Sequence, residues 1–324
     1  MGNSGGRTVV GVLRGDGAVG FTVQSSTNRY TSIGGNSISH DDAGNLTVDK
    51  DGYKYFYDYE NRVVRIQKPD GLGGWDDVAQ MAYDTLGRRI RVIDSVASTT
   101  TLYYYNPEWQ CLAEYSGAGT LQRYFVYGNY IDEPLVMNDG TDNYYYAQDH
   151  LYSTAALIDD GGSVVERYEY DAYGTVLVFT DDGNDDTWFT GDDTTAASSA
   201  IGNSYTFTGR RLDVLDAGNL VRMHYRRRDY DVHAGRFVQQ DPLAYVDGLN
   251  CFEYTKSNPI LSSDPLGTCT EFAKKTKGGK KWKTGDFLKH YCFGKDPYDE
   301  GDAVDLDEIG LLEDFKNAPS AVSI

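Results

Sequence analysis

Two Asp-Pro pairs late in the chain, Asp241-Pro242 and Asp264-Pro265, are its strongest candidates for chemistry. Two carboxylates that the fold brings together cannot both ionise easily, so they can share one proton. One of them then activates a water molecule while the other protonates a scissile carbonyl group. Asp-Pro pairs also begin turns without any catalytic role. The two pairs therefore indicate either an acid–base dyad or a structural motif.

Two further groups of residues have both a chemical and a structural interpretation. Asp149 and His150 adjoin and could do acid–base work, but neighbours on a strand point to opposite faces, which favours a structural role. A basic cluster follows later in the chain: Arg222, Arg226, Arg227, Arg228 and Arg236. These arginines either pair with Asp229 and Asp231 on a sheet or contact nucleic acid, and the pairing is the favoured interpretation.

A calcium loop is a weaker candidate. Asp182, Asn184 and Asp186 have the 1-3-5 spacing of an EF-hand loop, with Asp193 at position 12. Thr187 stands where that loop needs glycine, and Asp193 replaces the bidentate glutamate. The surrounding segment, residues 180–200, is polar and acidic and is predicted to be a surface loop. We therefore expect no metal site and no cofactor beyond this weak candidate.

The elements that position these residues are predicted from an irregular repeat. Its unit is an aromatic residue, Asp, two residues, Gly or Asn, and then alternating apolar residues, as in 57–63, 83–88 and 170–176. The Asp side chain can accept a backbone hydrogen bond from two residues on, and the Gly can take positive φ, as a three-residue hairpin with a bulge requires. Each unit is thus a strand–turn–strand element that must pair with its neighbours. The pattern predicts an all-β fold, an antiparallel strip that curls because strands twist.

Composition supports this fold and excludes several functions. The chain has 27 Tyr, 36 Gly and a net charge of −19, and this charge disfavours nucleic-acid binding through the scaffold. No apolar run is long enough for a membrane span, and no signal peptide is visible at the start. Four cysteines are too few for a disulfide framework. The tyrosines are expected to pack as cross-strand pairs, or alternatively to stack on sugars.

Several segments resemble, in order, the RHS/YD-repeat proteins and their C-terminal core. The resemblance covers roughly residues 27–267. Residues 149–154 are similar to that family's DHLGST segment, with Tyr152 where Gly is usual. The other matching segments are residues 83–90, 167–174, 207–210 and a closing stretch from Arg228 to Gly267. The resemblance implies repeats wound into a hollow β-shell, which the core closes around a variable C-terminal segment that is often a toxin.

The resemblance also implies a role for the two Asp-Pro pairs. It assigns Asp241 and Asp264 to an aspartic self-cleavage just after Leu266-Gly267, so the cleavage region is Leu266, Gly267 and Thr268. The chain departs from the family in having Gln240 where Arg is often found, Ala244 in place of Gly, and one extra residue between the pairs. The missing arginine would remove a charge that could hold a carboxylate ionised or stabilise an oxyanion.

Three domains are expected: a lead-in at 1–26, the repeats and core closure at 27–267, and a variable tail at 268–324. In the tail, the three-residue spacing of Leu306, Ile309, Leu312 and Phe315 predicts one short helix. Cys269 and Cys292 could form a disulfide after export. The lysines from 274 to 283, with His290, could belong to a nuclease, although a fragment or nontoxic remnant is the favoured interpretation.

The sequence therefore predicts a scaffold that encloses or presents its C-terminal segment. The enzymatic candidates are an aspartic autoprotease and a toxin enzyme in the tail, and no metabolic activity is expected. A surface module that binds carbohydrate or protein through exposed Tyr is the alternative. The expected partners are the chain's own C-terminal segment or repeats upstream, and an immunity or secretion partner. Because the chain begins inside the repeat pattern, we expect it to be the end of a longer exported or cell-surface protein, or a truncated copy.

Overall fold

The computed structural model describes residues 7–13, 17–24, 26–183, 185 and 187–272, and these residues confirm the all-β prediction. The predicted tail helix and Cys292 lie outside the described residues. The strands and 3-10 turns are β1 (Arg7–Leu13), β2 (Gly17–Gln24), β3 (Arg29–Ile33), β4 (Asn36–Ser37), β5 (Ser39–His40), β6 (Leu46–Val48), β7 (Lys54–Tyr57), β8 (Val63–Pro69), β9 (Trp75–Tyr83), β10 (Arg89–Asp94), β11 (Thr99–Tyr105), β12 (Cys111–Ser116), β13 (Leu121–Tyr127), β14 (Pro134–Asn138), β15 (Asn143–Gln148), β16 (Thr154–Ile158), β17 (Val164–Tyr170), β18 (Val176–Asp181), β19 (Thr194–Ala196), η1 (Phe207–Gly209), β20 (Arg211–Leu215), η2 (Asp216–Gly218), β21 (Leu220–Tyr225), β22 (Arg228–Asp231), β23 (Arg236–Phe237), η3 (Thr255–Ser257), β24 (Ser262–Ser263) and β25 (Glu271–Phe272).

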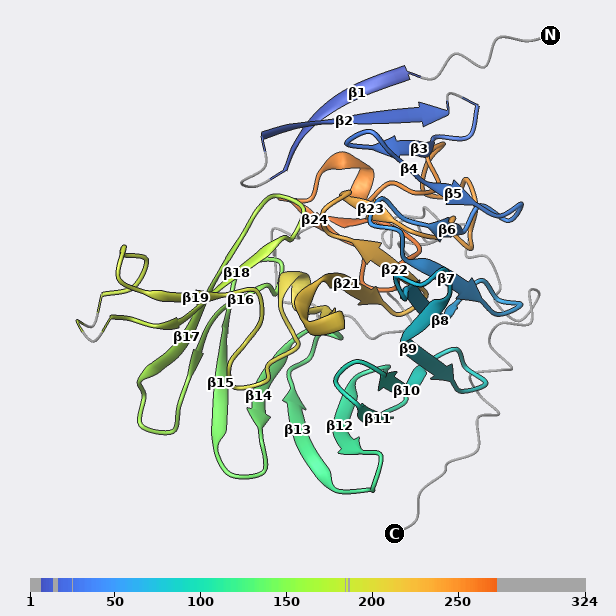
Figure 1. Cartoon of the computed structure of the whole chain (residues 1–324). Helices are drawn as coiled ribbons and strands as arrows, with labels where there is room; N and C mark the ends of the chain where they lie inside the picture. The colour runs from blue at the N-terminus through green and yellow to red at the C-terminus, as the bar shows by residue number, and fades with distance from the viewer. Residues whose placement is uncertain (1–6, 14–16, 25, 184, 186, 273–324) are drawn as a thin grey trace, which may run out of the picture. The chain divides into compact units, whose positions relative to one another are not determined.

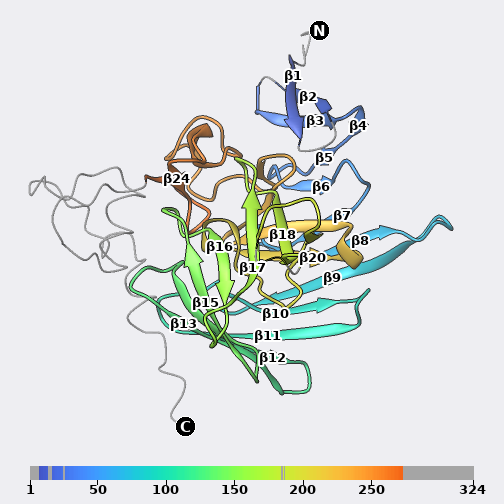
Figure 2. The ribbon, with the colours of Figure 1, turned by 90° about the vertical axis from the view of Figure 1, so that its left-hand side faces the viewer.

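Strands β5 to β19 form one 15-stranded sheet, which we call the strip, and every strand pairs with the next one along the chain. All of these pairings are antiparallel, as the strand–turn–strand repeat predicts. The strip curls, so that β21 and β22 lie on its inner side (Figures 1 and 2). Strands β1 and β2, within the predicted lead-in, pair with β3 in a separate four-stranded sheet.

The repeat turns have the predicted hydrogen bonds. The Asp84 carboxylate accepts from the backbone N–H groups of Leu86 and Arg88, at 3.0 and 2.9 Å. Gly87 takes a φ of +82°, which glycine adopts without steric cost. Trp109 and Tyr152 occupy the same turn position with φ of +65° and +66°. The turn therefore forms even where glycine is missing, because the Asp or Asn side chain supplies its hydrogen bonds.

A second regularity of the repeat was not predicted. The tyrosine that precedes a turn donates its hydroxyl to a backbone carbonyl five residues after the first turn residue of an earlier unit. These bonds are Tyr57 to Leu46 at 2.7 Å, Tyr83 to Val63 at 2.9 Å, Tyr105 to Arg89 at 2.9 Å and Tyr170 to Thr154 at 2.8 Å. The repeat tyrosines thus connect successive units by hydrogen bonds, in addition to the expected packing.

Replacing one of these tyrosines by phenylalanine should destabilise the strip. In Tyr83→Phe the Val63 carbonyl loses its hydroxyl partner in a buried setting, which should lower the free energy of unfolding by about 1–2 kcal/mol. The midpoint of urea unfolding measures this loss. Tyr59→Phe is the control, because Tyr59 is 90% exposed and should change stability very little. Equal effects of the two substitutions would contradict the role of the hydroxyl.

Residues 204–272, which we call the inner module, pack against the strip through buried ion pairs. Arg89 of the strip holds Asp213 at 2.6 and 2.8 Å through two nitrogens. Arg211 of the module pairs with Glu114 of the strip. Isolated buried charges are very costly, so each of these groups requires its partner.

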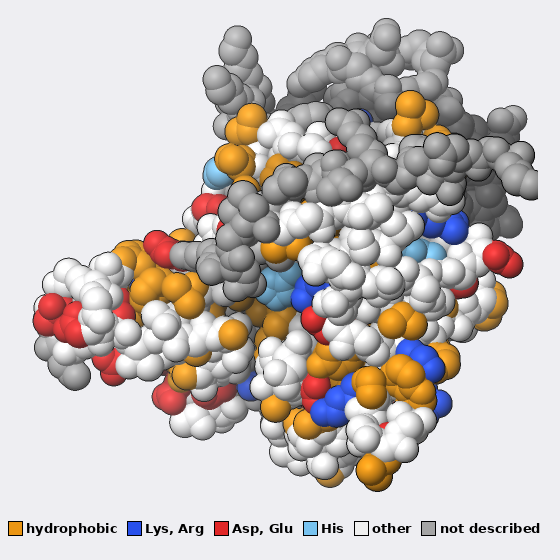
Figure 3. All heavy atoms as spheres, turned by 45° about the horizontal axis from the view of Figure 1, so that its top comes forward, with side chains coloured by type: hydrophobic (Ala, Val, Ile, Leu, Met, Phe, Trp, Pro, Cys, Tyr) orange, Lys and Arg blue, Asp and Glu red, His pale blue; other side chains and the backbone are white. Residues whose placement is uncertain are grey.

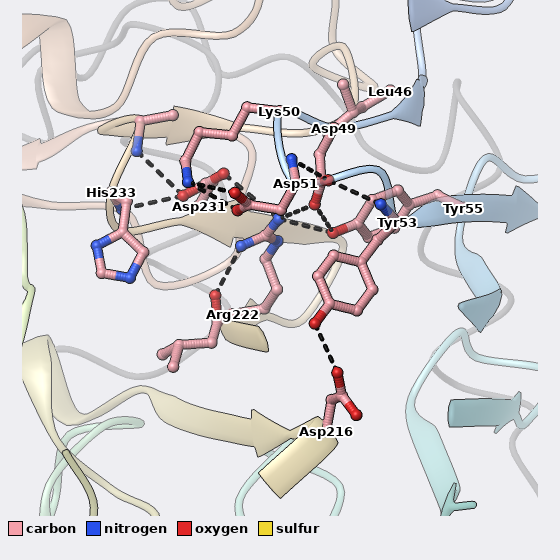
Figure 4. A network of polar contacts seen from close by, with 12 residues as sticks. Leu46, Asp49, Lys50, Asp51, Tyr53, Tyr55, Asp216, Arg222, Asp231 and His233 are labelled. Carbon is pink, nitrogen blue, oxygen red and sulfur yellow. Dashed lines mark hydrogen bonds and ion pairs between the residues drawn. The ribbon is translucent and has the colours of Figure 1, made fainter. Parts of the chain in front are cut away.

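Arg222 of β21 joins the first repeats of the strip to the inner module. Its Nη2 lies 2.8 Å from Asp49 and 2.6 Å from the Tyr55 hydroxyl. The same guanidinium lies 3.5 Å from Asp231 of β22 (Figure 4). Two elements that are far apart in the sequence are thereby held together by one buried arginine.

The acidic segment 180–200 is not only a loop. Residues Thr194–Ala196 form β19 and pair with β18, so they add an edge strand to the strip. Sequence reasoning missed β19 because this edge strand is short and largely exposed. Its residues therefore show no apolar alternation. Acidic side chains gather on the projecting part of the surface that carries this hairpin (Figure 3). Within the described ranges, no helix is long and apolar enough to cross a membrane.

Candidate functional site

The fold brings Asp241 and Asp264 to one guanidinium group. Nη2 of Arg228 lies 2.9 Å from the Oδ2 atom of Asp241 and 3.1 Å from the Oδ2 atom of Asp264. Arg228 begins β22, Asp241 follows β23, and Asp264 follows β24. All three side chains are buried. Residues that are 13 to 36 positions apart thus form one cluster, as a catalytic dyad requires.

Burial dominates the electrostatics of this cluster. It raises the pKa of Asp241 to about 6, with Arg228 opposing the shift and Asp264 adding to it. Burial also raises the pKa of Asp264, again against the effect of Arg228. Removing a carboxylate from water disfavours its charged form, and a neighbouring carboxylate does the same. The pair is therefore suited to retain a shared proton at mildly acidic pH.

The turn between β21 and β22 holds the predicted cleavage segment by its backbone carbonyls. Arg226 donates to the Pro265 carbonyl, and Nε of Arg228 donates to the Gly267 carbonyl. Between them, the Arg227 N–H donates to the Leu266 carbonyl at 3.3 Å. Three successive carbonyls of the segment are thus bound by three successive residues of one turn.

The backbone of Tyr225 lies so close to position 267 that only glycine fits there. Its φ is +69°, and a Cβ atom there would lie 2.3 Å from the Tyr225 carbonyl oxygen. The residues that follow Gly267 are bound by Asp264. Its Oδ1 atom accepts from the N–H groups of Thr268 at 2.9 Å and Cys269 at 3.1 Å. The Gly267–Thr268 peptide therefore has its carbonyl on Arg228 and its N–H on Asp264.

This contact pattern differs from the predicted chemistry in one respect. The sequence suggests that a carboxyl group protonates the scissile carbonyl, whereas the Gly267 carbonyl faces an arginine. Asp264 lies instead at the amide nitrogen, the position from which an acid can protonate a leaving amine. Asp241 borders a small polar pocket together with Asp247, Cys251 and Lys256. The arrangement therefore places one carboxyl group and one positive charge at this peptide bond, with the second carboxyl group on the same guanidinium.

Two of the three departures from the family motif, Gln240 and Ala244, have surroundings that the structure describes. The Gln240 side chain lies against the first repeat turn, since a Cβ on Gly44 would be 2.4 Å from its Nε2 atom. Position 240 therefore faces the strip, while the side chain of the next residue, Asp241, points to Arg228. Ala244 has a φ of +55°, a conformation in which glycine is the less strained residue. The alanine is accommodated one turn after Asp241.

The basic cluster pairs, but mostly not with the predicted partners. Arg222 does lie near Asp231, yet its shorter contact is to Asp49 of the strip. Arg226 pairs with Asp132 at 2.7 Å, and Arg228 with the dyad. Asp229 contacts His224 and Gln239 instead. Spacing along the chain suggested cross-strand neighbours, but Arg222 and Arg226 pair with carboxylates of the strip, and Arg228 pairs with loop residues of its own module.

The structure does not bring the residues of the other candidate sites together. Asp149 accepts from the N–H groups of Leu151 and Ser153 at the start of a turn, while His150 contacts the Ile260 carbonyl at 3.0 Å. They do not act as a pair in this arrangement. The calcium candidates Asn184 and Asp186 lie outside the described residues. Asp193 accepts from Phe189 and Thr190 in a local turn.

Sequence reasoning missed the contacts that Arg226 and Arg228 make with the predicted cleavage segment. Both appear in the basic cluster, so their charge was noticed. Nothing in their spacing indicates the carbonyls of Pro265 and Gly267, because those contacts span 39 positions. A cluster of arginines in a chain with a net charge of −19 is the sequence signal that pointed to them.

Comparison with known proteins places these features in a family. No protein-family model matches the chain. The tRNA nuclease WapA of Bacillus subtilis (strain 168) is 26% identical over 245 residues, which are 74% of this chain and 9% of WapA. Toxin subunit YenC1 of Yersinia entomophaga is 28% identical over 144 residues, or 44% of this chain and 13% of YenC1. The Photorhabdus luminescens Tc holotoxin pore with a mutated TccC3 has a TM-score of 0.57 at 16% identity, covering 82% of this chain and 12% of that one.

This chain is an RHS/YD-repeat protein. The repeat turns, the strand order and the relatives agree on this assignment. As an RHS/YD-repeat chain, it spans about a tenth of the length of the curated relatives it matches. The domain limits at residues 26 and 267 stay predictions.

Proposed function

We propose that this chain is the closing part of an exported toxin of the RHS/YD-repeat type. The strip and the inner module form a scaffold that encloses or presents the C-terminal segment. Asp241 and Asp264 release that segment by cutting the chain just after Gly267. The proposed partners are the released segment itself, further repeats of a longer chain, and other toxin, secretion or immunity components.

One observation carries this proposal: the Gly267–Thr268 peptide contacts Asp264, one of the two carboxyls that share Arg228. The Thr268 N–H is 2.9 Å from Asp264, and Asp264 shares an arginine nitrogen with Asp241. A purely structural Asp-Pro turn does not need a second buried carboxylate beside it, because each carboxylate taken out of water carries a desolvation cost. The names of the relatives, a tRNA nuclease and a toxin subunit, support a toxin context.

Intact mass after expression tests the proposal. We expect one product that ends at Gly267 with a free carboxyl group and a second that begins at Thr268. The rate should be first order and unchanged by hundredfold dilution, because the site and the cut bond belong to one chain. A stable species of 36.0 kDa after long incubation at mildly acidic and neutral pH would overturn self-cleavage.

The rate of cleavage should depend on pH in a definite direction. The dyad needs one ionised and one protonated carboxyl, and the raised pKa of Asp241, about 6, keeps the shared proton bound up to that pH. Above it the proton is lost, so the rate should fall by up to about tenfold per pH unit. Full-length protein isolated in denaturant and refolded at a series of pH values would give this profile. A rate that still rises between pH 7 and 9 would contradict it.

A binding surface is the second candidate function. Tyr104, Tyr124 and Tyr145 lie on one outer face of the strip, on β11, β13 and β15, and are 54%, 40% and 42% exposed. A row of exposed aromatic rings can stack on sugars or contact a protein. A glycan array should then show binding that Tyr124→Ala weakens, and an array without any bound glycan would remove the carbohydrate form of this alternative.

A further inference from the structure

A small cavity lies between the strip and the inner module, and neither carboxyl of the proposed dyad lines it. Its volume is about 30 Å³, which is room for about two water-sized particles. Most of the charged side chains that line it are arginines. Four of these are only 1–6% exposed: Arg89, Arg210, Arg211 and Arg226. A fifth, Arg88, is half-buried and pairs with Asp84 at 2.6 Å.

The buried charges around this cavity do not balance. Arg89 and Arg211 each pair with one carboxylate. Asp132, in contrast, is shared by Arg210 and Arg226, at 2.6 and 2.7 Å. Four buried guanidinium groups thus face three carboxylates, so one positive charge is left over. Burial and the Arg210 charge both lower the pKa of Arg226. Because an uncompensated buried charge is costly, the cavity favours a ligand with one negative charge.

Among the described residues that line the cavity, no other titratable group supplies this negative charge. Burial raises the pKa of the Cys111 thiol to about 11, and it also raises the pKa of the tyrosine hydroxyls there, so these groups stay protonated. Burial lowers the pKa of His224, which is therefore a neutral ring. Asp229 contacts that ring at 3.4 Å, but it does not line the cavity, and burial raises its pKa.

Unpartnered donors are available at the same cavity. The Nε atoms of Arg89, Arg210 and Arg226 are buried and have no hydrogen-bond partner within the part of the chain that the structure describes. A buried N–H group without a partner costs free energy, and an anion accepts strong hydrogen bonds from such groups. Arg222 is the contrast: its Nε atom is also unpartnered, but two carboxylates lie beside its guanidinium group. Only the cavity arginines combine unpartnered donors with an excess of positive charge.

We propose that this cavity binds one small monovalent anion of the size of chloride. The anion neutralises the charge that Asp132 leaves unmatched and accepts from the unpartnered Nε donors. A guanidinium group is weakly hydrated, which suits it to a buried ion pair of this kind. Tetrahedral phosphate and sulfate are too large for the space and carry more charge than it lacks. The anion belongs to the interface between strip and module, and the proposal does not depend on self-cleavage.

Chloride-dependent stability tests the site. Urea unfolding of the full chain, in the Asp241→Asn background, is followed at constant ionic strength while sodium gluconate is replaced stepwise by sodium chloride. An anion that binds only the folded state should lower the unfolding equilibrium constant about tenfold for each tenfold rise in chloride above its dissociation constant. Sodium bromide should act in the same way. Gluconate is too large for the cavity, so an unfolding constant that does not change on its replacement would overturn the proposal.

Four substitutions in the same background locate the anion. Cys111→Asp places a carboxylate in the cavity, so the chloride dependence should disappear, whereas Cys111→Ser is uncharged and should keep it. Arg226→Gln removes the unmatched charge and should also abolish the dependence, and it decides the matter if Cys111→Asp fails to fold. Arg222→Gln is the control, since Arg222 is a buried arginine of the module that does not line the cavity. A dependence retained in both Cys111→Asp and Arg226→Gln would overturn the proposal.

Crystals of the full chain grown in sodium bromide give a direct view of the site. We expect one anomalous scattering peak in the cavity, within hydrogen-bond reach of Arg210 and Arg226. Ordered water in the cavity with no bromide peak would overturn the proposal, even if chloride stabilises the chain, because the stabilising anion would then bind elsewhere.

Discussion

Asp241→Asn and Asp264→Asn are each expected to leave the chain at full length. An amide can neither take a proton from water nor give one to the Thr268 nitrogen, so each substitution removes an essential proton transfer. Such transfers contribute about 10²–10⁴-fold to rate, and we expect a loss of at least about 10³-fold. The fraction cleaved over time, followed by intact mass from a refolding start, measures this loss.

Asp229→Asn is the matched control for both variants. Asp229 is also buried and its pKa is also raised by burial, but it contacts His224 and Gln239 rather than the cleavage segment. Its amide variant should therefore cleave at a rate close to that of the parent chain. If all three variants lose cleavage together, the cause is general damage to the inner module, and the assignment of the dyad fails.

Asp213→Ala should be the most destabilising of the substitutions considered. Its removal leaves the Arg89 guanidinium, 1% exposed, without the carboxylate that binds two of its nitrogens. Breaking a buried ion pair on one side costs about 3–5 kcal/mol, because an uncompensated charge remains inside the protein. Urea unfolding in the uncleaved Asp241→Asn background would measure the loss without interference from cleavage.

Two control variants test whether unpaired charge causes the loss of stability in Asp213→Ala. Lys50→Ala removes an exposed pair with Asp51 and should cost no more than about 1 kcal/mol. The double variant Arg89→Met with Asp213→Leu removes both charges and should recover much of the stability lost in Asp213→Ala. If the double variant is less stable than the single one, packing volume rather than unpaired charge explains the effect.

The inner module depends on such pairs because its surface toward the strip is rich in arginine. Asp132, between β13 and β14, accepts from both Arg210 at 2.6 Å and Arg226 at 2.7 Å. Arg226 in turn holds the Pro265 carbonyl. The same buried charges that join the module to the strip thus also position the cleavage segment. Substitutions at this interface should alter stability and cleavage together.

The strip is the part that could be predicted from sequence. Its turns depend on contacts within five residues, such as Asp84 with Leu86 and Arg88, and Gly87 with positive φ. Because each turn returns the chain directly beside itself, the strand order follows from the turns alone. The identity of the dyad was also accessible, through the resemblance of its two Asp-Pro pairs to a known motif.

The sequence by itself therefore determined the hairpins, their serial pairing and the candidate carboxylates. Only the tertiary structure decided that Arg228 joins Asp241 and Asp264, that Gln240 faces the strip, and that the Gly267 carbonyl meets a guanidinium group. The physical reason is range: turn chemistry acts between neighbours in the chain, so its spacing is visible in the sequence. Buried charges instead take whichever partner the packing of two distant sheets brings near, and no fixed spacing records that choice.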